Sequence, residues 1–326
     1  MRHEGSVRRV LFILACAGAC WLFGARSVLA QQERDLKLFR PLVDVSVEGI
    51  AKSDFDEGDG QYGSGNFSLT ANLPLGPARV RMVDGAMTGH QYLALASLSR
   101  TEPTIDFVDR NVTLYSGSLS FAALALNRRG NLYIGALGAS AAEDDKTVHS
   151  PDPRFYGLGL ATYNKSSILT FVYGGAASYQ YGRPLALPLF GVLWSPKARW
   201  TFGTLVPVWL WATLEKNDHF KITYLFGVTG DRYRFANEGQ FPSTATRTIP
   251  DTVYFRVTQP RLGVEFEYHS SRDIALVAQT GIIGQWNLAF AEGNNENFET
   301  RTVKPAGYLK LGARFTFGKS LFDKAP

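Results

Sequence analysis

Three features of the sequence predict an all-β fold, a single up-and-down antiparallel transmembrane β-barrel. The chain begins like a secreted protein, most later segments alternate apolar and polar residues, and very short turns alternate with longer, more acidic connections. Bacterial outer-membrane barrels combine short periplasmic turns and longer extracellular loops with strands that are apolar on one face. A hydrophobic fraction of 45% fits such a barrel, because only every second residue of a spanning strand faces lipid.

A signal peptide is predicted over residues 1–30, with cleavage after Ala30. Arginines near the start precede the apolar residues 10–24, and Val28-Leu29-Ala30 forms a small-residue cleavage site. The apolar run is about 15 residues long, whereas a helix that spans a bilayer needs roughly 20. An uncleaved anchor and a lipoprotein acylated at Cys16 or Cys20 are the alternatives.

Cleavage would change the composition of the mature protein. Both cysteines of the chain, Cys16 and Cys20, would leave with the signal, so the mature chain would form no disulfides and bind no metal through cysteine. The signal carries four arginines and one glutamate, so the net charge falls from +5 to +2. This small surplus gives no reason to expect a nucleic-acid partner.

The mature chain is expected to form one barrel domain over residues 31–317, followed by a tail of residues 318–326. The last strand shows the pattern most clearly, because residues 308–317 carry apolar side chains at every odd position from Leu309 to Phe317. Side chains alternate between the two faces of a strand, so one face suits lipid and the other suits water. The expected strands are residues 42–51, 64–74, 88–100, 113–126, 130–139, 154–163, 167–179, 187–195, 199–206, 208–215, 219–230, 252–268, 273–285 and 306–317.

Six very short turns imply 14 strands when both chain ends lie on the same side of the membrane. The reversal at Val206-Pro207-Val208 decides this number, because 12 strands is the alternative if the residues around it form one kinked strand. The six turns are Leu75–Ala78, Asn127–Gly130, Asn164–Ser166, Ser195–Ala198, Glu215–Asp218 and His269–Arg272.

The apolar positions change phase between residues 251 and 268. Residues 253–257 are apolar at odd positions, whereas residues 262–268 are apolar at even positions. We expect one long strand with a bulge at Pro260, because a slip of one residue would return the apolar side chains to the outward face, which meets lipid. Two short strands are the alternative.

Tryptophans are expected at the membrane–water interface, where an apolar ring with one polar N–H is favoured. The alternative is ordinary aromatic packing in a soluble sandwich. The tryptophans near predicted strand ends are Trp194, Trp200, Trp209, Trp211 and Trp286.

The second half of the chain resembles a known family. A loop with the sequence Tyr-Gly-Arg-Pro-Leu-Ala-Leu-Pro occupies residues 181–188, Trp194-Ser195-Pro196 forms a turn, and residues 230–234 read Gly-Asp-Arg-Tyr-Arg. In this order the motifs resemble an uncharacterised, porin-like family of bacterial outer-membrane β-barrels that is known as a domain of unknown function. The resemblance extends over residues 44–317 and implies a barrel in the outer membrane, but it implies no activity. The tail after Phe317 departs from the terminal aromatic residue that such barrels use in assembly.

No catalytic, cofactor or metal site is predicted. An outer-membrane lipid hydrolase would need a serine and a histidine within hydrogen-bond reach, and the histidines are expected at turns, loops or strand starts. The acidic loop Asp54–Gly60 lacks the ligand spacing of an EF-hand. A lipid-modifying enzyme is therefore the least favoured function. The histidines of the mature chain are His90, His149, His219 and His269.

The wet face of the strands carries both signs of charge. Such residues can line a water-filled path through a barrel, or they can pair with each other and fill it. We therefore expect a passive channel for small solutes in the bacterial outer membrane, and a structural or interaction barrel with a plugged lumen is the alternative. The expected partners are outer-membrane lipid, small solutes and the barrel assembly machinery. The residues predicted to line the lumen are Lys221, Arg261, Glu265, Glu267, Lys310 and Arg314.

Overall fold

The computed structural model describes residues 41–317 except 84–85, 167, 181–182, 198, 244–246, 272 and 293–296, so the predicted signal peptide and C-terminal tail lie outside the described residues. Within this part of the chain, no helix is long and apolar enough to cross a membrane. The strands are β1 Leu42–Asp54, β2 Gln61–Pro74, β3 Arg79–Val83, β4 Ala86–Ile105, β5 Leu114–Leu126, β6 Leu132–Asp144, β7 Arg154–Ser166, β8 Leu169–Gln180, β9 Arg183–Lys197, β10 Trp200–Val206, β11 Trp209–Asn217, β12 Phe220–Ala236, β13 Thr252–His269, β14 Ile274–Ile283, β15 Trp286–Ala291, β16 Asn297–Val303 and β17 Ala306–Thr316.

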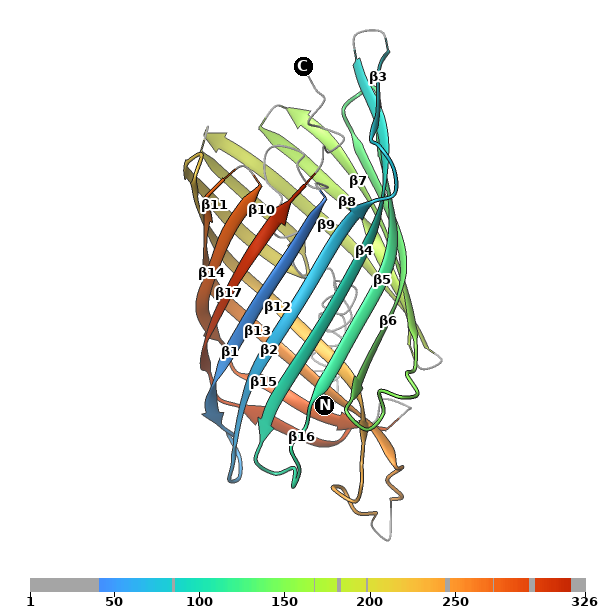
Figure 1. Cartoon of the computed structure of the whole chain (residues 1–326), viewed down its shortest axis with the longest axis vertical. Helices are drawn as coiled ribbons and strands as arrows, with labels where there is room; N and C mark the ends of the chain where they lie inside the picture. The colour runs from blue at the N-terminus through green and yellow to red at the C-terminus, as the bar shows by residue number, and fades with distance from the viewer. Residues whose placement is uncertain are drawn as a thin grey trace, which may run out of the picture.

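The strands form one closed antiparallel barrel (Figure 1). Each strand pairs with its neighbours along the chain, and the ring closes because β1 pairs with both β2 and β17. Three strands of the barrel are each made of two segments. The segments β2 and β3 form one strand, because both pair with β4. Likewise β14 and β15 both pair with β13, and β16 and β17 form the strand next to them, because β16 pairs with β15 and β17 pairs with β14. The barrel therefore has 14 strands, which confirms the predicted number and excludes 12.

Short turns lie at one end of the barrel, together with both ends of the described chain, and we call this the turn end (Figure 1). The turn after β5 shows how the sequence makes such a reversal. The side chain of Asn127 accepts hydrogen bonds from the N–H groups of Arg129 and Asn131 at 2.9 and 3.0 Å. Gly130 has a φ of +74°, which glycine adopts without the steric cost of a side chain.

Five of the six predicted turns lie at strand reversals, but the turn at Leu75–Ala78 was wrong. The chain breaks there without reversing, and β3 continues in line to pair with the first residues of β4. The resulting hairpin projects beyond the turn end in Figure 1. The cause is visible in residues 79–82, which alternate polar and apolar side chains and so extend the strand pattern.

The reversal at Val206-Pro207-Val208 is confirmed, because β10 and β11 pair with each other on either side of it. The predicted bulge at Pro260 was wrong. β13 is one strand, and its pairing with β12 continues without a shift from Thr252 to Tyr268. Odd-numbered residues point inward along the whole strand. The apolar residues change from odd to even positions because the interior of the barrel changes along its axis. The inward residues among 253–257 lie where the interior is apolar, whereas the apolar residues among 262–268 face outward where the interior is polar.

An apolar cluster fills the barrel at the end opposite the turn end, which we call the loop end. Its rings pack on Phe290, whose centroid lies 4.5 Å from that of Phe241, 5.0 Å from Phe255 and 5.4 Å from Phe235. We call this cluster the loop-end core. Its main members are Ile50, Phe55, Tyr62, Ile105, Val108, Val112, Leu114, Tyr233, Phe235, Val253, Phe255, Trp286, Leu288, Phe290 and Val303.

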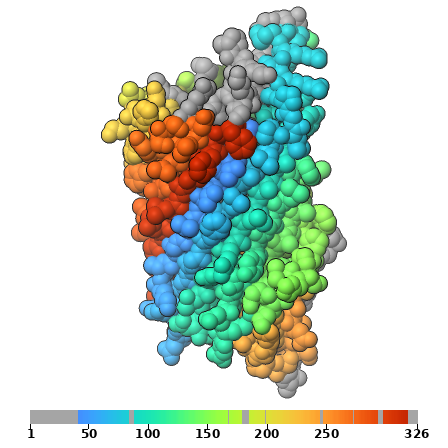
Figure 2. Space-filling model, in the orientation of Figure 1, coloured from blue at the N-terminus to red at the C-terminus, as the bar shows by residue number. Residues whose placement is uncertain are grey.

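The ring of strands narrows at the loop end. β12 pairs with β11 from Phe220 to Gly227 but continues to Ala236, where its end reaches across to β6 and Arg234 pairs in parallel with Glu143. In Figure 2 the orange residues at the far end of the β12–β13 hairpin lie against the green strands. We call this junction the seam. It bypasses β7 to β11, so the loop end is closed by fewer strands than the turn end.

Buried cations hold the seam together. The guanidinium group of Arg154 donates to the carbonyl of Arg232 at 2.7 Å and to the carbonyl of Ala142 at 3.0 Å, and so connects β12 with β6. Arg110 pairs with Asp144, which also accepts the N–H of Ala236 at 2.9 Å. Charge-assisted bonds of this kind are roughly twice as strong as neutral ones.

A second apolar cluster lines the lumen on the β4–β12 side, and we call it the wall core. Three tryptophans expected at the membrane interface lie inside the barrel instead. Trp209 and Trp211 point inward, and each ring covers a glycine of a neighbouring strand, Gly227 and Gly203 respectively. Trp286 belongs to the loop-end core. The main members of the wall core are Leu93, Leu124, Leu132, Ile134, Leu160, Leu187, Leu189, Leu205, Trp211 and Leu225.

Candidate functional site

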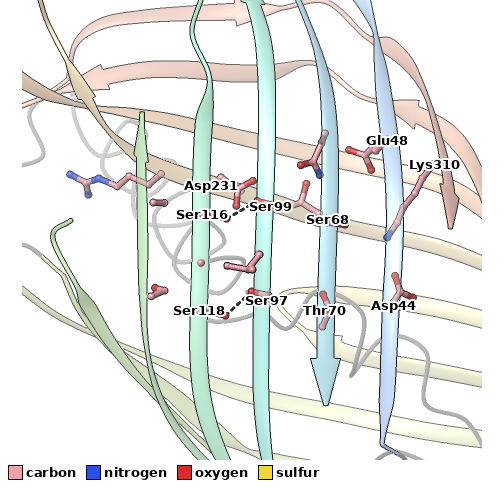
Figure 3. Close-up of a pocket in the computed structure, with 18 of the residues that line it drawn as sticks. Asp44, Glu48, Ser68, Thr70, Ser97, Ser99, Ser116, Ser118, Asp231 and Lys310 are labelled. Carbon is pink, nitrogen blue, oxygen red and sulfur yellow. Dashed lines mark hydrogen bonds between the residues drawn. The ribbon is translucent and has the colours of Figure 1, made fainter. Parts of the chain in front are cut away.

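A polar cavity lies inside the barrel between the loop-end core and the wall core (Figure 3). Its volume is about 150 Å³. One side is formed by β2, β4, β5 and β6, and the other by β1, β11, β12, β13, β14 and β17. An engineered protein cavity of about 150 Å³ binds benzene, so the space has room for a small solute.

The β2–β6 side of the cavity is a wall of hydroxyl groups. Serine and threonine stand at alternate positions of these strands, so the hydroxyls face inward. Figure 3 shows the serines of β4 and β5 facing each other in pairs, and the oxygens are 2.7 Å apart in both Ser97–Ser118 and Ser99–Ser116. The hydroxyl wall was not predicted from the sequence, although serines at alternate positions in two successive strands are its signal.

The opposite side carries charges that are already paired. Arg261 donates two hydrogen bonds to the carboxylate of Glu48, at 2.8 and 3.0 Å, and a third to the side chain of Gln259 at 2.6 Å. The charged side chains that face the cavity are Asp44, Glu48, Asp231, Arg261 and Lys310. Arg232 follows Asp231 and points to the other face of β12, where its guanidinium lies 4.5 Å from the centroid of the Tyr254 ring. Together with Arg314, which pairs with Asp44 at 3.2 Å, the group has three acids and three bases.

Between the cavity and the turn end the polar side continues as a cluster of ion pairs. Arg314 contacts Glu267 at 2.5 Å and Asp44 at 3.2 Å, and all three are buried. Lys221 lies 3.9 Å from Glu267 and 4.0 Å from Glu215. The polar interior thus extends from the cavity toward the turn end, along the side of the lumen that faces the wall core.

The six residues predicted to line the lumen all lie on inward-facing positions of β12, β13 and β17. Two of them, Arg261 and Lys310, line the cavity, whereas Lys221, Glu267 and Arg314 form the ion cluster nearer the turn end. The sixth, Glu265, is buried on β13 between Arg261 and Glu267. The prediction missed Asp231 because the expected strand ended at residue 230, whereas β12 continues to Ala236. It also missed Asp44 and Glu48, although residues 43–48 alternate valine with polar residues.

Two aromatic rings border the cavity. The indole of Trp209 lies against Gly227, which has no side chain to displace it. Tyr308 accepts a hydrogen bond from the amide of Gln279 at 2.8 Å, and the guanidinium of Arg261 lies over its ring at 5.1 Å. Both rings are therefore held in place by their neighbours.

Two of the histidines lie in neighbouring turns at the turn end. His269 contacts Glu267 at 2.5 Å, and the ring nitrogen Nδ1 of His219 lies 3.1 Å from the carbonyl of His269. In the acidic loop, Asp54 and Asp56 accept hydrogen bonds from the amides of Gln61 and Gln285, at 2.8 and 3.1 Å. No group of three or more histidine, cysteine or acidic side chains that could hold a metal occurs among the described residues.

Comparison with protein families decides the membership of the chain. Residues 111–318 match the family described as a domain of unknown function, DUF6268. The chain belongs to this family. The expected resemblance to an uncharacterised barrel family is thereby confirmed, although the match begins later than residue 44. No curated protein matches the sequence.

Solved structures give only distant likenesses. The COG4313 outer membrane channel from Pseudomonas putida F1 is 9% identical, with 87% of this chain and 100% of that chain covered and a TM-score of 0.39. A FadL homologue from Pseudomonas aeruginosa is 9% identical, with 93% and 98% covered and a TM-score of 0.33. The translocator domain of the autotransporter NalP from Neisseria meningitidis is 10% identical, with 95% and 98% covered and a TM-score of 0.34. Likenesses this distant support no argument about activity.

Proposed function

We propose that this protein is an outer-membrane channel for small solutes whose extracellular end is closed by the loop-end core. The predicted signal peptide and an apolar outer surface support the location. Large apolar side chains on the outer face are well exposed, for example Leu98, Phe121, Leu137 and Phe190. Lipid would cover them, since a soluble protein rarely exposes so many together. The turn end would then face the periplasm and the loop end the outside.

The polar cavity is the observation that carries the channel proposal. Charged and hydroxyl side chains in a barrel interior suit water and polar solutes, and they set the selectivity of a path. The ion cluster around Arg314 continues this surface toward the periplasm.

The loop-end core favours a second candidate, a structural or interaction barrel whose outer mouth stays shut. Its residues are buried, and the seam ties β12 to β6 across the opening. In the channel proposal this closure is reversible. The two candidates thus differ in one respect, which is whether the loop-end core opens.

Current through single molecules in planar bilayers tests the proposal. The channel proposal expects discrete openings of the purified protein, and more of them when the loop-end core is weakened. A barrel that stays silent in both forms would support the structural candidate. We propose no enzymatic role, and unchanged membrane lipids on overexpression are the expected result for that reason.

A further inference from the structure

We propose that the cavity binds a small, neutral, polyhydroxylated solute, a compound of the saccharide class. This inference rests on the proposed channel function and names the solute that the channel would take. It follows from the balance of the charges, the density of hydroxyl and amide groups, and the two aromatic rings at the border.

The charges of the cavity do not favour an ion. Arg261 pairs with Glu48, and Arg314 pairs with Asp44. The remaining charged side chains that face the cavity, Asp231 and Lys310, are one acid and one base, so there is no formal excess of either sign. The strongest cation, Arg261, already holds Glu48 through two bonds of 2.8 and 3.0 Å. A charged solute would lose its water and would also have to compete with this pair, without a compensating surplus of opposite charge. A neutral solute loses less hydration free energy than an ion and does not compete for the pair.

The hydroxyl wall suits a solute that carries many hydroxyl groups. A serine or threonine hydroxyl both donates and accepts a hydrogen bond. Ser97, Ser99, Ser116 and Ser118 satisfy each other in pairs, and each keeps further accepting capacity toward the cavity. A ring of hydroxyls therefore finds donors and acceptors on the β2–β6 side, in place of those it had in water.

The aromatic border suits the other surface of such a solute. A saccharide ring presents C–H groups on its faces, and a flat apolar side chain covers them well. Trp209 offers such a surface, because its ring is held against Gly227 and borders the cavity. Gln279, Asn66 and Asp231 stand around the same space with planar polar groups, which bind neighbouring hydroxyls.

Three probes of nearly equal size that share one ring separate the possibilities: glucose, glucuronate and glucosamine, which are neutral, anionic and cationic. Saturation-transfer NMR on the full mature chain in deuterated detergent detects weak binding of each. We expect the glucose signal to be the strongest. The double variant Ser97→Ala/Ser118→Ala should weaken glucose binding about fivefold, the effect of losing one neutral hydrogen bond. Ser270→Ala, which removes a hydroxyl in a turn at the turn end, should leave it unchanged.

A glucuronate or glucosamine signal as strong as that of glucose would overturn the inference, and so would a double variant that binds glucose like the wild type. Trp209→Leu provides a second check that does not involve the serines, and unchanged glucose binding in this variant would also count against the inference. Conductance is measured separately. A barrel that conducts without preferring glucose refutes only this inference, whereas a silent barrel refutes the channel itself.

Discussion

Phe290 is the residue on which the closure of the barrel depends most clearly. Its side chain is 1% exposed and contacts the rings of Phe235, Phe241 and Phe255. Truncating a buried phenylalanine to alanine commonly costs 3–5 kcal/mol, about the range we expect for Phe290→Ala. If opening separates these rings, the same free energy shifts the ratio of open to closed molecules. Since about 1.4 kcal/mol is a factor of ten, the ratio should rise at least ~100-fold.

The assay is the open probability of single molecules in planar bilayers, measured for the wild type and for Phe290→Ala. Phe121→Ala is the matched control, because Phe121 lies on the outer face of β5 and is 56% exposed. It should change the open probability little. A folded Phe290→Ala barrel that opens no more often than the wild type would refute the reasoning, because the loop-end core would then not be the closure.

Further predictions address the seam, the cavity charges and the inward tryptophans. Arg154→Gln removes charge-assisted bonds to two carbonyls and should lower the free energy of unfolding by about 3 kcal/mol, measured by urea titration. Lys310→Glu replaces a positive charge at the cavity with a negative one, so the reversal potential in a salt gradient should shift toward cation selectivity, whereas Lys304→Glu at the exposed loop end should not shift it. Gly203→Ala places a methyl group 2.1 Å from the ring of Trp211 and should lower the free energy of unfolding by about 1–3 kcal/mol. Adding Trp211→Leu should relieve this clash. Gly135→Ala is the control and should be neutral, because the added methyl group has no atom within 4 Å.

The strand ladder was predictable because alternation and turns are local properties of the sequence. The reversal at Pro207 and all five of the other confirmed turns lie where polar or proline-containing residues interrupt the alternation. The prediction at Leu75–Ala78 was wrong because the alternation breaks there before the chain reverses, and a short alternating segment after the break continues the strand as β3.

The closure of the loop end could not be predicted from alternation. Val253, Phe255 and Val257 were assigned to a lipid face, because an apolar residue in a membrane strand normally faces lipid. They point inward because segments that are distant in the sequence, such as those that carry Phe241 and Phe290, pack together inside the loop end. The same cause placed Trp286 in the core instead of at the interface. A contact between residues far apart in the chain leaves no periodic signal in either segment.

The charged lumen residues were within reach of the sequence, but their partners were not. Parity placed Arg261 and Arg314 on the inward face. It gave no sign that Arg261 pairs with Glu48 on β1, more than 200 residues away. That pairing depends on the closure of the ring, which brings the first strand next to the last.

Labelling of single cysteines tests the central claim, that lipid surrounds this barrel and water fills its cavity. The described chain contains no cysteine, so Ser97→Cys, Ser118→Cys and Leu119→Cys can each be made alone. Ser97 and Ser118 line the cavity, whereas Leu119, which is adjacent to Ser118 on β5, does not and is 50% exposed on the outer face. In purified outer membranes a charged, water-soluble maleimide should label Ser97→Cys and Ser118→Cys and leave Leu119→Cys largely unmodified. Faster labelling of Leu119→Cys would contradict the account.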